Sequence, residues 1–155
     1  MINFFTANSE IITRLGLAVI LGVLIGFERV LVHKVAGMKT HALVSMGSAL
    51  FVIISEFITI KYANIGGFDP TRIASQIIVG IGFLGAGSIM LQGSRLRGLT
   101  TAGGLWVTAG IGMAAGFGFF ALATIATIFV LLILTVIYFF ERPLREREMS
   151  DNTLN

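Results

Sequence analysis

The fold is decided by one stretch, Gly98 to Phe140: GLTTAGGLWVTAGIGMAAGFGFFALATIATIFVLLILTVIYFF, 43 consecutive residues without a charged side chain. As a single helix it would be roughly 65 Å long at about 1.5 Å per residue, about twice the thickness of a bilayer's hydrocarbon core. It must therefore fold back. The expected corner is Gly116-Phe117-Gly118, because two glycines permit a tight turn. The stretch predicts two membrane-spanning helices, at about 99–115 and 119–140.

The rest of the chain has the same character. Hydrophobic residues make up 55% of it, charged residues only 12%, and the mean hydropathy is +0.93. A soluble domain carries about a quarter charged residues. Further apolar segments lie at about 11–27, 42–60 and 73–91. The sequence therefore predicts an all-α membrane protein: one transmembrane domain over 1–140 with about five helices, or four spans if one segment is re-entrant.

The two ends of the chain need separate interpretation. The first apolar segment has no basic region before it and no small-residue cleavage site after it, so we expect a retained helix and not a signal peptide. Residues 141–155 alternate charges and then become polar, which predicts a short charged tail that frays. The chain has no cysteine, which excludes disulfides and thiol chemistry.

Lysine and arginine are distributed unevenly between the two predicted sides of the membrane. With five spans, eight fall on the side of the C-terminus: Arg29, Lys34, Lys39, Arg95, Arg97, Arg142, Arg145 and Arg147. Three fall on the other side: Arg14, Lys61 and Arg72. Because basic residues favour the cytoplasmic side, we expect the C-terminus inside and the N-terminus outside. The net charge of +3 then reflects membrane orientation, and we expect no nucleic-acid partner.

Glycines recur at helical spacing within the predicted spans. Close backbone approach drives helix association in lipid, so these glycines predict tight helix packing. The residues expected to pack helices are Gly80, Gly82, Gly85, Gly87, Gly112 and Gly116, and Gly22 with Gly26 forms a further pair. The alternative is a locally broken helix whose freed carbonyls line an ion path. The letters of residues 80–85 match a dinucleotide fingerprint, but no acid follows and the phosphate-loop lysine is absent, so we expect no nucleotide cofactor and no enzyme.

A polar stripe on the third predicted helix is the candidate functional site. Arg72 and Gln76 lie one turn apart and share a face. Asp69 precedes them as an expected N-cap, and Glu28 with Arg29 closes the first span on the opposite side. Two interpretations remain open for Arg72 and Gln76: a polar lock between helices, or a functional site, since an amide inside a span needs a partner. His33 and His41 are a weak metal signal, and we expect no metal site.

Several segments together resemble the MgtC/SapB family of bacterial inner-membrane proteins. They are Glu28-Arg29, residues 36–50 (AGMKTHALVSMGSAL), 72–76 (RIASQ), 80–87 (GIGFLGAG), 97–102 (RGLTTA) and 105–109 (LWVTA). The resemblance covers roughly Gly22 to Gly118. Lys39 stands where the family usually has arginine, and Gly103-Gly104 where alanine or threonine is more usual. Longer members carry a soluble C-terminal domain, whereas this sequence ends soon after its fifth predicted span.

The resemblance implies a function in adaptation to low magnesium or acid stress. The best-known members are virulence factors that support growth in low magnesium, and the resemblance implies regulation of the F-type ATP synthase by a membrane contact. The alternative is an ion transporter, magnesium being the named candidate, that acts as an oligomer. Magnesium prefers oxygen ligands, yet none of the predicted spans places a carboxylate at the midplane. Candidate partners are the lipid bilayer, further copies of the chain and ATP synthase membrane subunits. A scaffold that only assembles with itself is the third reading.

Overall fold

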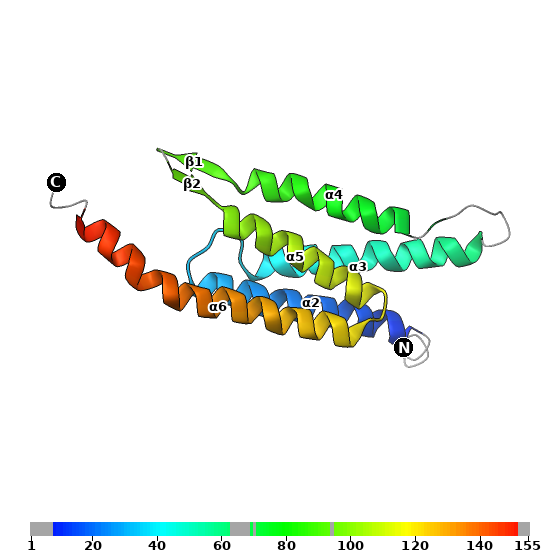
Figure 1. The fold of residues 1–155 in the computed structure, drawn as a ribbon. Coiled ribbons are helices and arrows are strands. Elements are labelled where there is room, and N and C mark those ends of the chain that lie inside the picture. Colours follow the sequence, from blue (N-terminus) through cyan, green and yellow to red (C-terminus); the bar gives the residue numbers. More distant parts are fainter. Residues whose placement is uncertain (1–7, 63–68, 70, 94, 152–155) are drawn as a thin grey trace.

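The computed structural model of the chain describes residues 8–62, 69, 71–93 and 95–151, and within these the protein is almost entirely helical. Figure 1 shows the helices running across the view with roughly aligned axes. The elements in chain order are α2 (Ser9–Leu31), α3 (Met38–Lys61), α4 (Thr71–Gly87), β1 (Met90–Gln92), β2 (Arg95–Arg97), α5 (Leu99–Gly116) and α6 (Phe120–Asp151).

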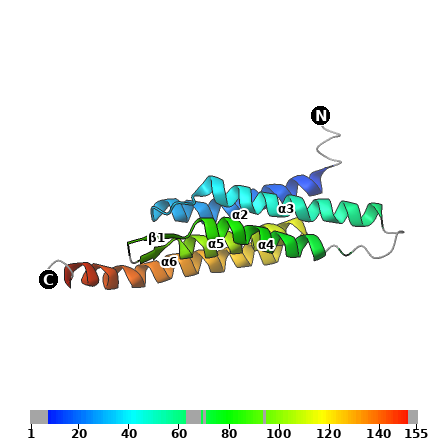
Figure 2. The ribbon, with the colours of Figure 1, turned by 90° about the horizontal axis from the view of Figure 1, so that it is seen from above.

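The helices form two layers with α5 at the centre. Seen from above, α2 and α3 make one layer, and α4, α5 and α6 make the other (Figure 2). Helix α5 contacts α2, α3, α4 and α6. The loop between α2 and α3 and the hairpin β1–β2 lie at one end of the bundle, called here the hairpin end (Figure 1). The start of α2 and the turn between α5 and α6 lie at the other end, called here the turn end.

The packing is the reverse of that in a soluble protein. The larger core cluster consists mostly of small side chains, including Ala18, Ala49, Ala115 and Ala123. Large apolar side chains point outward instead: Phe83 is 81% exposed and Phe140 is 73% exposed. Soluble monomers rarely leave so much contiguous apolar surface in water. Small residues inside and large apolar residues outside are what a bundle in lipid requires, so the prediction of an all-α membrane protein is confirmed.

The helices differ in how well they match a bilayer. Three are long and apolar enough to cross a membrane: Ser9–Leu31, Met38–Lys61 and, within α6, Phe120–Glu141. Helices α4 and α5 have 17 and 18 residues. At about 1.5 Å per residue each is roughly 25–27 Å long, slightly less than the ~30 Å hydrocarbon core. The prediction of five crossings, and of their orientation, stays a prediction.

Two local predictions about the chain path need correction. The third apolar segment was expected to be helical to residue 91, but α4 ends at Gly87 and Met90–Gln92 forms strand β1. The Ser88 hydroxyl donates to the Gly85 carbonyl at 2.7 Å, which occupies a carbonyl of the last turn. The tail was expected to fray, yet the α6 backbone stays helical to Asp151. The glutamate, arginine, leucine and methionine residues of this segment are good helix formers.

The corner between the last two helices lies where two glycines predicted it. Helix α5 ends at Gly116 and α6 begins at Phe120. Gly118 has a φ of 77°, a left-handed conformation that favours glycine. The Phe119 amide donates to the Ala114 carbonyl at 2.8 Å and closes the turn.

Candidate functional site

The structure divides the predicted polar site between the two ends of the bundle. Asp69, Arg72 and Gln76 lie at the start of α4, at the end away from the hairpin, whereas Glu28 and Arg29 lie at the hairpin end of α2 (Figure 1). The five residues therefore do not converge on one centre. Whether either group acts as a site stays a prediction.

Asp69 caps α4 through its carboxylate. Its Oδ1 accepts from the Thr71 backbone N–H at 2.9 Å and from the Thr71 hydroxyl at 2.7 Å. These hydrogen bonds stabilise the charged form and hold the pKa of Asp69 below its usual value. The Asp69 backbone carbonyl also accepts from the Arg72 N–H at 3.2 Å. The cap positions the next turn, which carries Arg72 on the exposed surface.

Gln76 lines an open apolar groove between α3 and α4. The groove has a volume of about 480 Å³. Its lining from α3 is Leu43, Val44, Gly47, Ser48 and Phe51, and from α4 Ile73, Gln76, Ile77, Gly80, Ile81 and Leu84. The Gln76 side chain is exposed and is the longest polar group in this lining. In lipid, its amide would lack the hydrogen bonds that water supplies.

Three of the four glycines of helix α4 are uncovered by the described residues. A Cβ at Gly80, Gly82 or Gly87 would meet nothing within 4 Å among the described residues, and one at Gly85 would be 3.6 Å from the Ala102 Cβ. The expectation that all four pack against other helices is therefore not met within the chain for Gly80, Gly82 and Gly87. These three instead leave the backbone of α4 open, Gly80 and Gly87 on one face and Gly82 on the opposite face.

Close glycine packing occurs around α3 instead. Near the start of α3, Cβ atoms at Gly22 and Gly26 of α2 would lie 2.6 Å from the His41 carbonyl oxygen and 2.5 Å from the Met38 Cα. Further along the same helix, a Cβ at Gly112 of α5 would lie 2.1 Å from the Ser45 carbonyl oxygen. Gly116 is also tight, since its Cβ would lie 2.8 Å from the Ala49 Cα. Both predicted glycine pairs thus let α2 and α5 approach the backbone of α3 directly.

The face of α3 held between these glycines carries a buried polar cluster, which sequence reasoning missed. His41 and Ser45 are fully buried, one turn apart. The Thr108 hydroxyl of α5 donates to the Gly104 carbonyl at 2.7 Å, so its oxygen accepts the bond from His41 Nδ1 at 2.9 Å. His41 Nε2 is then the free acceptor of the ring, and neither it nor the Ser45 hydroxyl has a hydrogen-bond partner among the described residues.

The Glu28–Arg29 ion pair lies beside this cluster. Arg29 Nε pairs with Glu28 Oε2, and Arg29 is only 2% exposed. Both charges act on the His41 ring. The pair was expected to close the first span, and the structure shows both residues to be buried. The sequence did contain one signal for the buried polar cluster of α3. Small polar residues recur at helical spacing over 42–60, and His41 lies in register before them.

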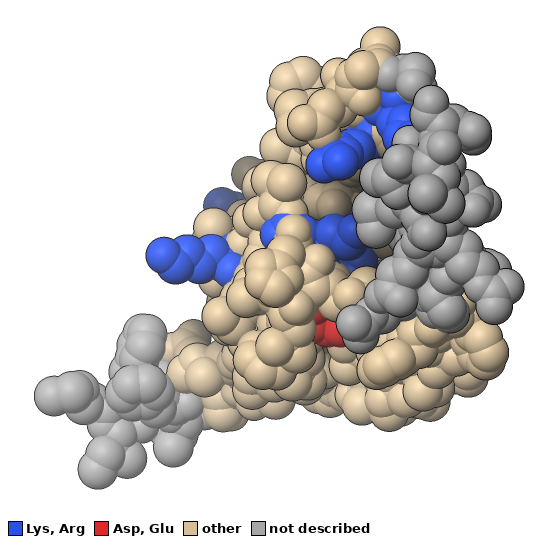
Figure 3. Space-filling view, turned by 90° about the vertical axis from the view of Figure 1, so that its left-hand side faces the viewer, with Lys and Arg blue, Asp and Glu red and all other residues tan. Residues whose placement is uncertain are grey.

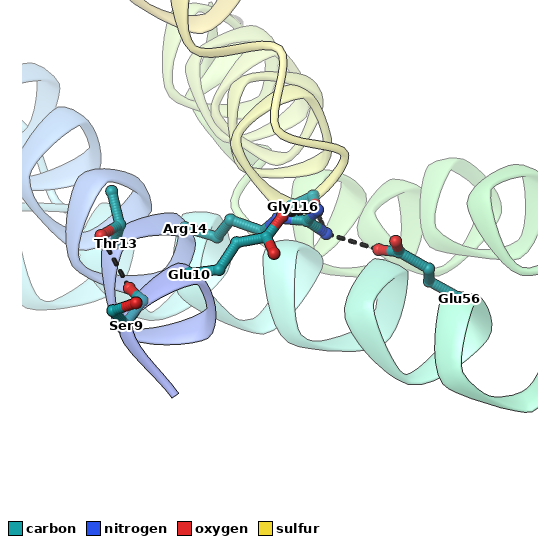
Figure 4. Close-up of polar contacts among 6 residues, drawn as sticks. All are labelled: Ser9, Glu10, Thr13, Arg14, Glu56 and Gly116. Carbon is teal, nitrogen blue, oxygen red and sulfur yellow. Dashed lines mark hydrogen bonds and ion pairs between the residues drawn. The ribbon is translucent and has the colours of Figure 1, made fainter. Parts of the chain in front are cut away.

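A second ion cluster joins three elements at the turn end (Figure 4). The Arg14 guanidinium of α2 pairs with Glu10 on its own helix and with Glu56 of α3, and its Nη1 donates to the Gly116 carbonyl at 3.0 Å. The Arg14 side chain is mostly buried, whereas that of Glu10 is exposed. The arginine therefore connects α2, α3 and the end of α5. The described residues hold no group of three or more histidine, cysteine, aspartate or glutamate side chains arranged for a metal.

Comparison with known proteins identifies the family. The chain is 45% identical over 133 residues to "Putative magnesium transporter YhiD" of Escherichia coli (strain K12), which covers 84% of this chain and 62% of that protein. It is 46% identical over 114 residues to "Protein MgtC" of Brucella abortus (strain 2308), and 47% to "Protein MgtC" of Salmonella typhimurium (strain LT2). These matches cover 74% of this chain but 45% and 46% of the two proteins, so the chain spans about half to two thirds of its relatives. No solved structure matches.

The family profile covers most of the chain. It matches residues 15–143, which include α3, the hairpin, α4 and α5 in full and most of α2 and α6. The matched region contains the groove, the buried polar cluster and Arg14's partners Glu56 and Gly116. The chain is an inner-membrane protein that belongs to the MgtC family.

Proposed function

We propose that the chain is a non-enzymatic membrane regulator that supports adaptation to low magnesium or acid stress through lateral contact with another membrane protein. The observation that carries this proposal is the open outer side of α4. Only Ile81 and Gly85 of its 17 residues are buried. Gly80, Gly82 and Gly87 leave its backbone accessible to a neighbouring helix, and the groove beside it can take a partner's side chains.

Gln76 gives this surface its specificity in the proposal. The groove is otherwise apolar, so a partner helix that offers Gln76 a hydrogen bond is favoured over lipid. The candidate partner is a membrane subunit of the F-type ATP synthase, as the family resemblance implies. A contact of this kind changes the activity of the partner and needs no catalytic group in this chain.

The alternative function is magnesium transport by an oligomer, and the printed name of the Escherichia coli relative favours it. An ion path through a single chain would be energetically costly. Glu28 is paired with Arg29, and Glu56 with Arg14, so each carboxylate would have to leave an ion pair to bind a cation. In an oligomer, the same α4 surface would join the copies.

Cross-linking from α4 separates these functions, and the absence of native cysteine makes single-cysteine variants unambiguous. Phe83→Cys places the probe on the open side of α4, and Phe129→Cys places a matched probe on the outward side of α6, where the phenylalanine is 60% exposed. In membranes from cells grown in low magnesium, we expect the Phe83→Cys variant, and not the control, to cross-link to ATP synthase membrane subunits. If the variant cross-links only to a second copy of the chain, and the protein also carries magnesium into proteoliposomes, the proposal of regulation would give way to that of transport.

Growth complementation tests Gln76 separately. Gln76→Leu should abolish growth support in low magnesium while membrane abundance and Tm stay at wild-type values, because the side chain is exposed within the chain. Ser75→Ala is the matched control on the same helix, since that hydroxyl bonds only to the Arg72 carbonyl in its own helix. Full complementation by Gln76→Leu would contradict the proposed contact.

A further inference from the structure

We propose that the hairpin β1–β2 is an interfacial lipid-binding element: Leu91 and Leu96 enter the acyl boundary, and Arg95 and Arg97 bind the phosphates of anionic lipids. The inference is independent of the α4 contact proposed above. It rests on the strand register, on the exposure of the hairpin, on its fixed position and on the charge of the end that carries it.

The register sorts the hairpin into two chemically different faces. Leu91 pairs with Leu96, whereas Met90 pairs with Arg97 and Gln92 with Arg95. Side chains of paired residues share a face, and successive residues alternate between faces. The two leucines therefore lie together on one face. Both arginines lie on the other face, so the hairpin is amphipathic.

Neither face is covered by the rest of the chain. All six strand residues are exposed, and Leu91 and Leu96 are 69% and 60% exposed. Exposing two adjacent leucine side chains to water is unfavourable for so small an element. A lipid surface covers the leucines and supplies anions for the arginines at the same time.

The hairpin's base is fixed at the membrane edge. Only Ser88 and Ile89 separate the last residue of α4 from β1, and Gly98 alone separates β2 from α5. Gly98 has a φ of 94°, and a Cβ there would lie 1.9 Å from the Ser88 carbonyl oxygen, so the two chain segments meet directly. A hairpin held this closely to the ends of two membrane helices lies at the interface and does not project into water as a separate domain.

The surrounding charge favours anionic lipid. Figure 3, viewed from the hairpin end, shows lysine and arginine side chains gathered over this end, with little acidic surface among the residues that the structure describes. Lys34 lies in the loop between α2 and α3, and Lys39 in the first turn of α3, both at this end. Each basic residue near a negatively charged bilayer surface strengthens binding about fivefold, and the pair Arg95 and Arg97 about 30-fold.

Depth measurements test where the two faces lie. Single cysteines at Leu91, Leu96 or Gln92 are labelled with an environment-sensitive fluorophore in nanodiscs of phosphatidylcholine and phosphatidylglycerol. We expect labels at 91 and 96 to emit at shorter wavelength and to be quenched by lipids with nitroxide-bearing acyl chains, and the label at 92 to report water. Equal, water-like emission from all three positions would overturn the proposal. That result is expected if the hairpin binds a soluble protein and not lipid.

Lipid titration tests the arginines. The Leu91→Cys protein, labelled, is titrated in neutral detergent with phosphatidylglycerol, with phosphatidylcholine or with inorganic phosphate. We expect a response to phosphatidylglycerol that Arg95→Gln with Arg97→Gln weakens about 30-fold, while Lys61→Gln at the other end of the bundle leaves it unchanged. An unchanged Tm establishes that the double variant is folded, as exposed side chains predict. An unweakened response in that variant, or an equal response to phosphatidylcholine or phosphate, would refute lipid binding by the hairpin.

Discussion

Gly112→Ala should destabilise the bundle far more than a glycine replacement usually does. The added Cβ would lie 2.1 Å from the Ser45 carbonyl oxygen, 2.7 Å from the Ser45 carbonyl carbon and 2.8 Å from the Ser45 Cα. Ordinary van der Waals contact begins at about 3.4 Å, and all three atoms belong to the backbone of α3. No rotamer change can relieve the contact, so α5 must move away from α3 by about 1 Å.

The magnitude follows from that displacement. Overpacking a core costs about 1–3 kcal/mol, and a clash against backbone lies at the upper end of this range. For a chain of this size, about 3 kcal/mol lowers Tm by roughly 6–12 °C. Moving α5 away from α3 also weakens the buried hydrogen bond between His41 and Thr108, because this bond joins the same two helices.

Gly110→Ala is the matched control, since it lies two residues before Gly112 on the same helix and its Cβ would meet nothing within 4 Å among the described residues. Both proteins are purified in mild detergent, and unfolding is followed by the fluorescence of Trp106, the single tryptophan. Gly110→Ala should melt at or slightly above the wild-type Tm, because alanine suits a helix better than glycine. If the two variants melt within about 2 °C of each other, the close approach of α5 to α3 does not limit stability, and the reasoning fails.

Three further substitutions test other parts of the structure. Gly98→Ala should abolish stable assembly, because it combines a left-handed backbone with a contact of 1.9 Å; wild-type yield in a detergent extract would contradict this. Arg14→Met should cost about 1–3 kcal/mol by removing the charged hydrogen bonds to Glu56 and to the Gly116 carbonyl, whereas Glu10→Gln, with a side chain 72% exposed, should cost less than about 1 kcal/mol; equal melting temperatures would argue against the ion cluster as a clamp. Thr108→Val should cost about 1–3 kcal/mol by leaving the His41 N–H without an acceptor, and an unchanged Tm would show that the ring finds another partner.

The sequence alone predicts the helices well, because apolar runs and glycine corners are local signals. The turn at Gly118 is an example, since its positive φ is a property of one residue. The hairpin was missed for a physical reason: Met90 and Leu91 are apolar and continue the hydropathy of α4, although Gly93 and the alternation around Leu96 were signals for a turn and a strand. Hydropathy measures the preference for lipid and does not distinguish a helix from a strand at the interface.

The site was harder to predict, because it depends on which helices meet. His41 and Thr108 are 67 residues apart, and Arg14 and Glu56 are 42 apart. Nothing local in the chain shows that Gly22 and Gly112 approach the same helix within one turn of each other. Arg72 and Gln76, in contrast, share a face by helical periodicity, and the structure places both on the exposed surface of α4.

The packing of α3 against α5 also constrains how the protein is made. His41 and Ser45 leave the ribosome early, but the α5 residue that accepts a hydrogen bond from His41 is synthesised 67 residues later. At about 5–20 residues per second, this delay is roughly 3–13 s. During that interval, the His41 imidazole of α3 has no partner from α5, in a helix that must leave the insertion machinery for lipid. We therefore expect α3 to stay at the translocation channel until α5 arrives, so that the middle of the chain inserts as one delayed step.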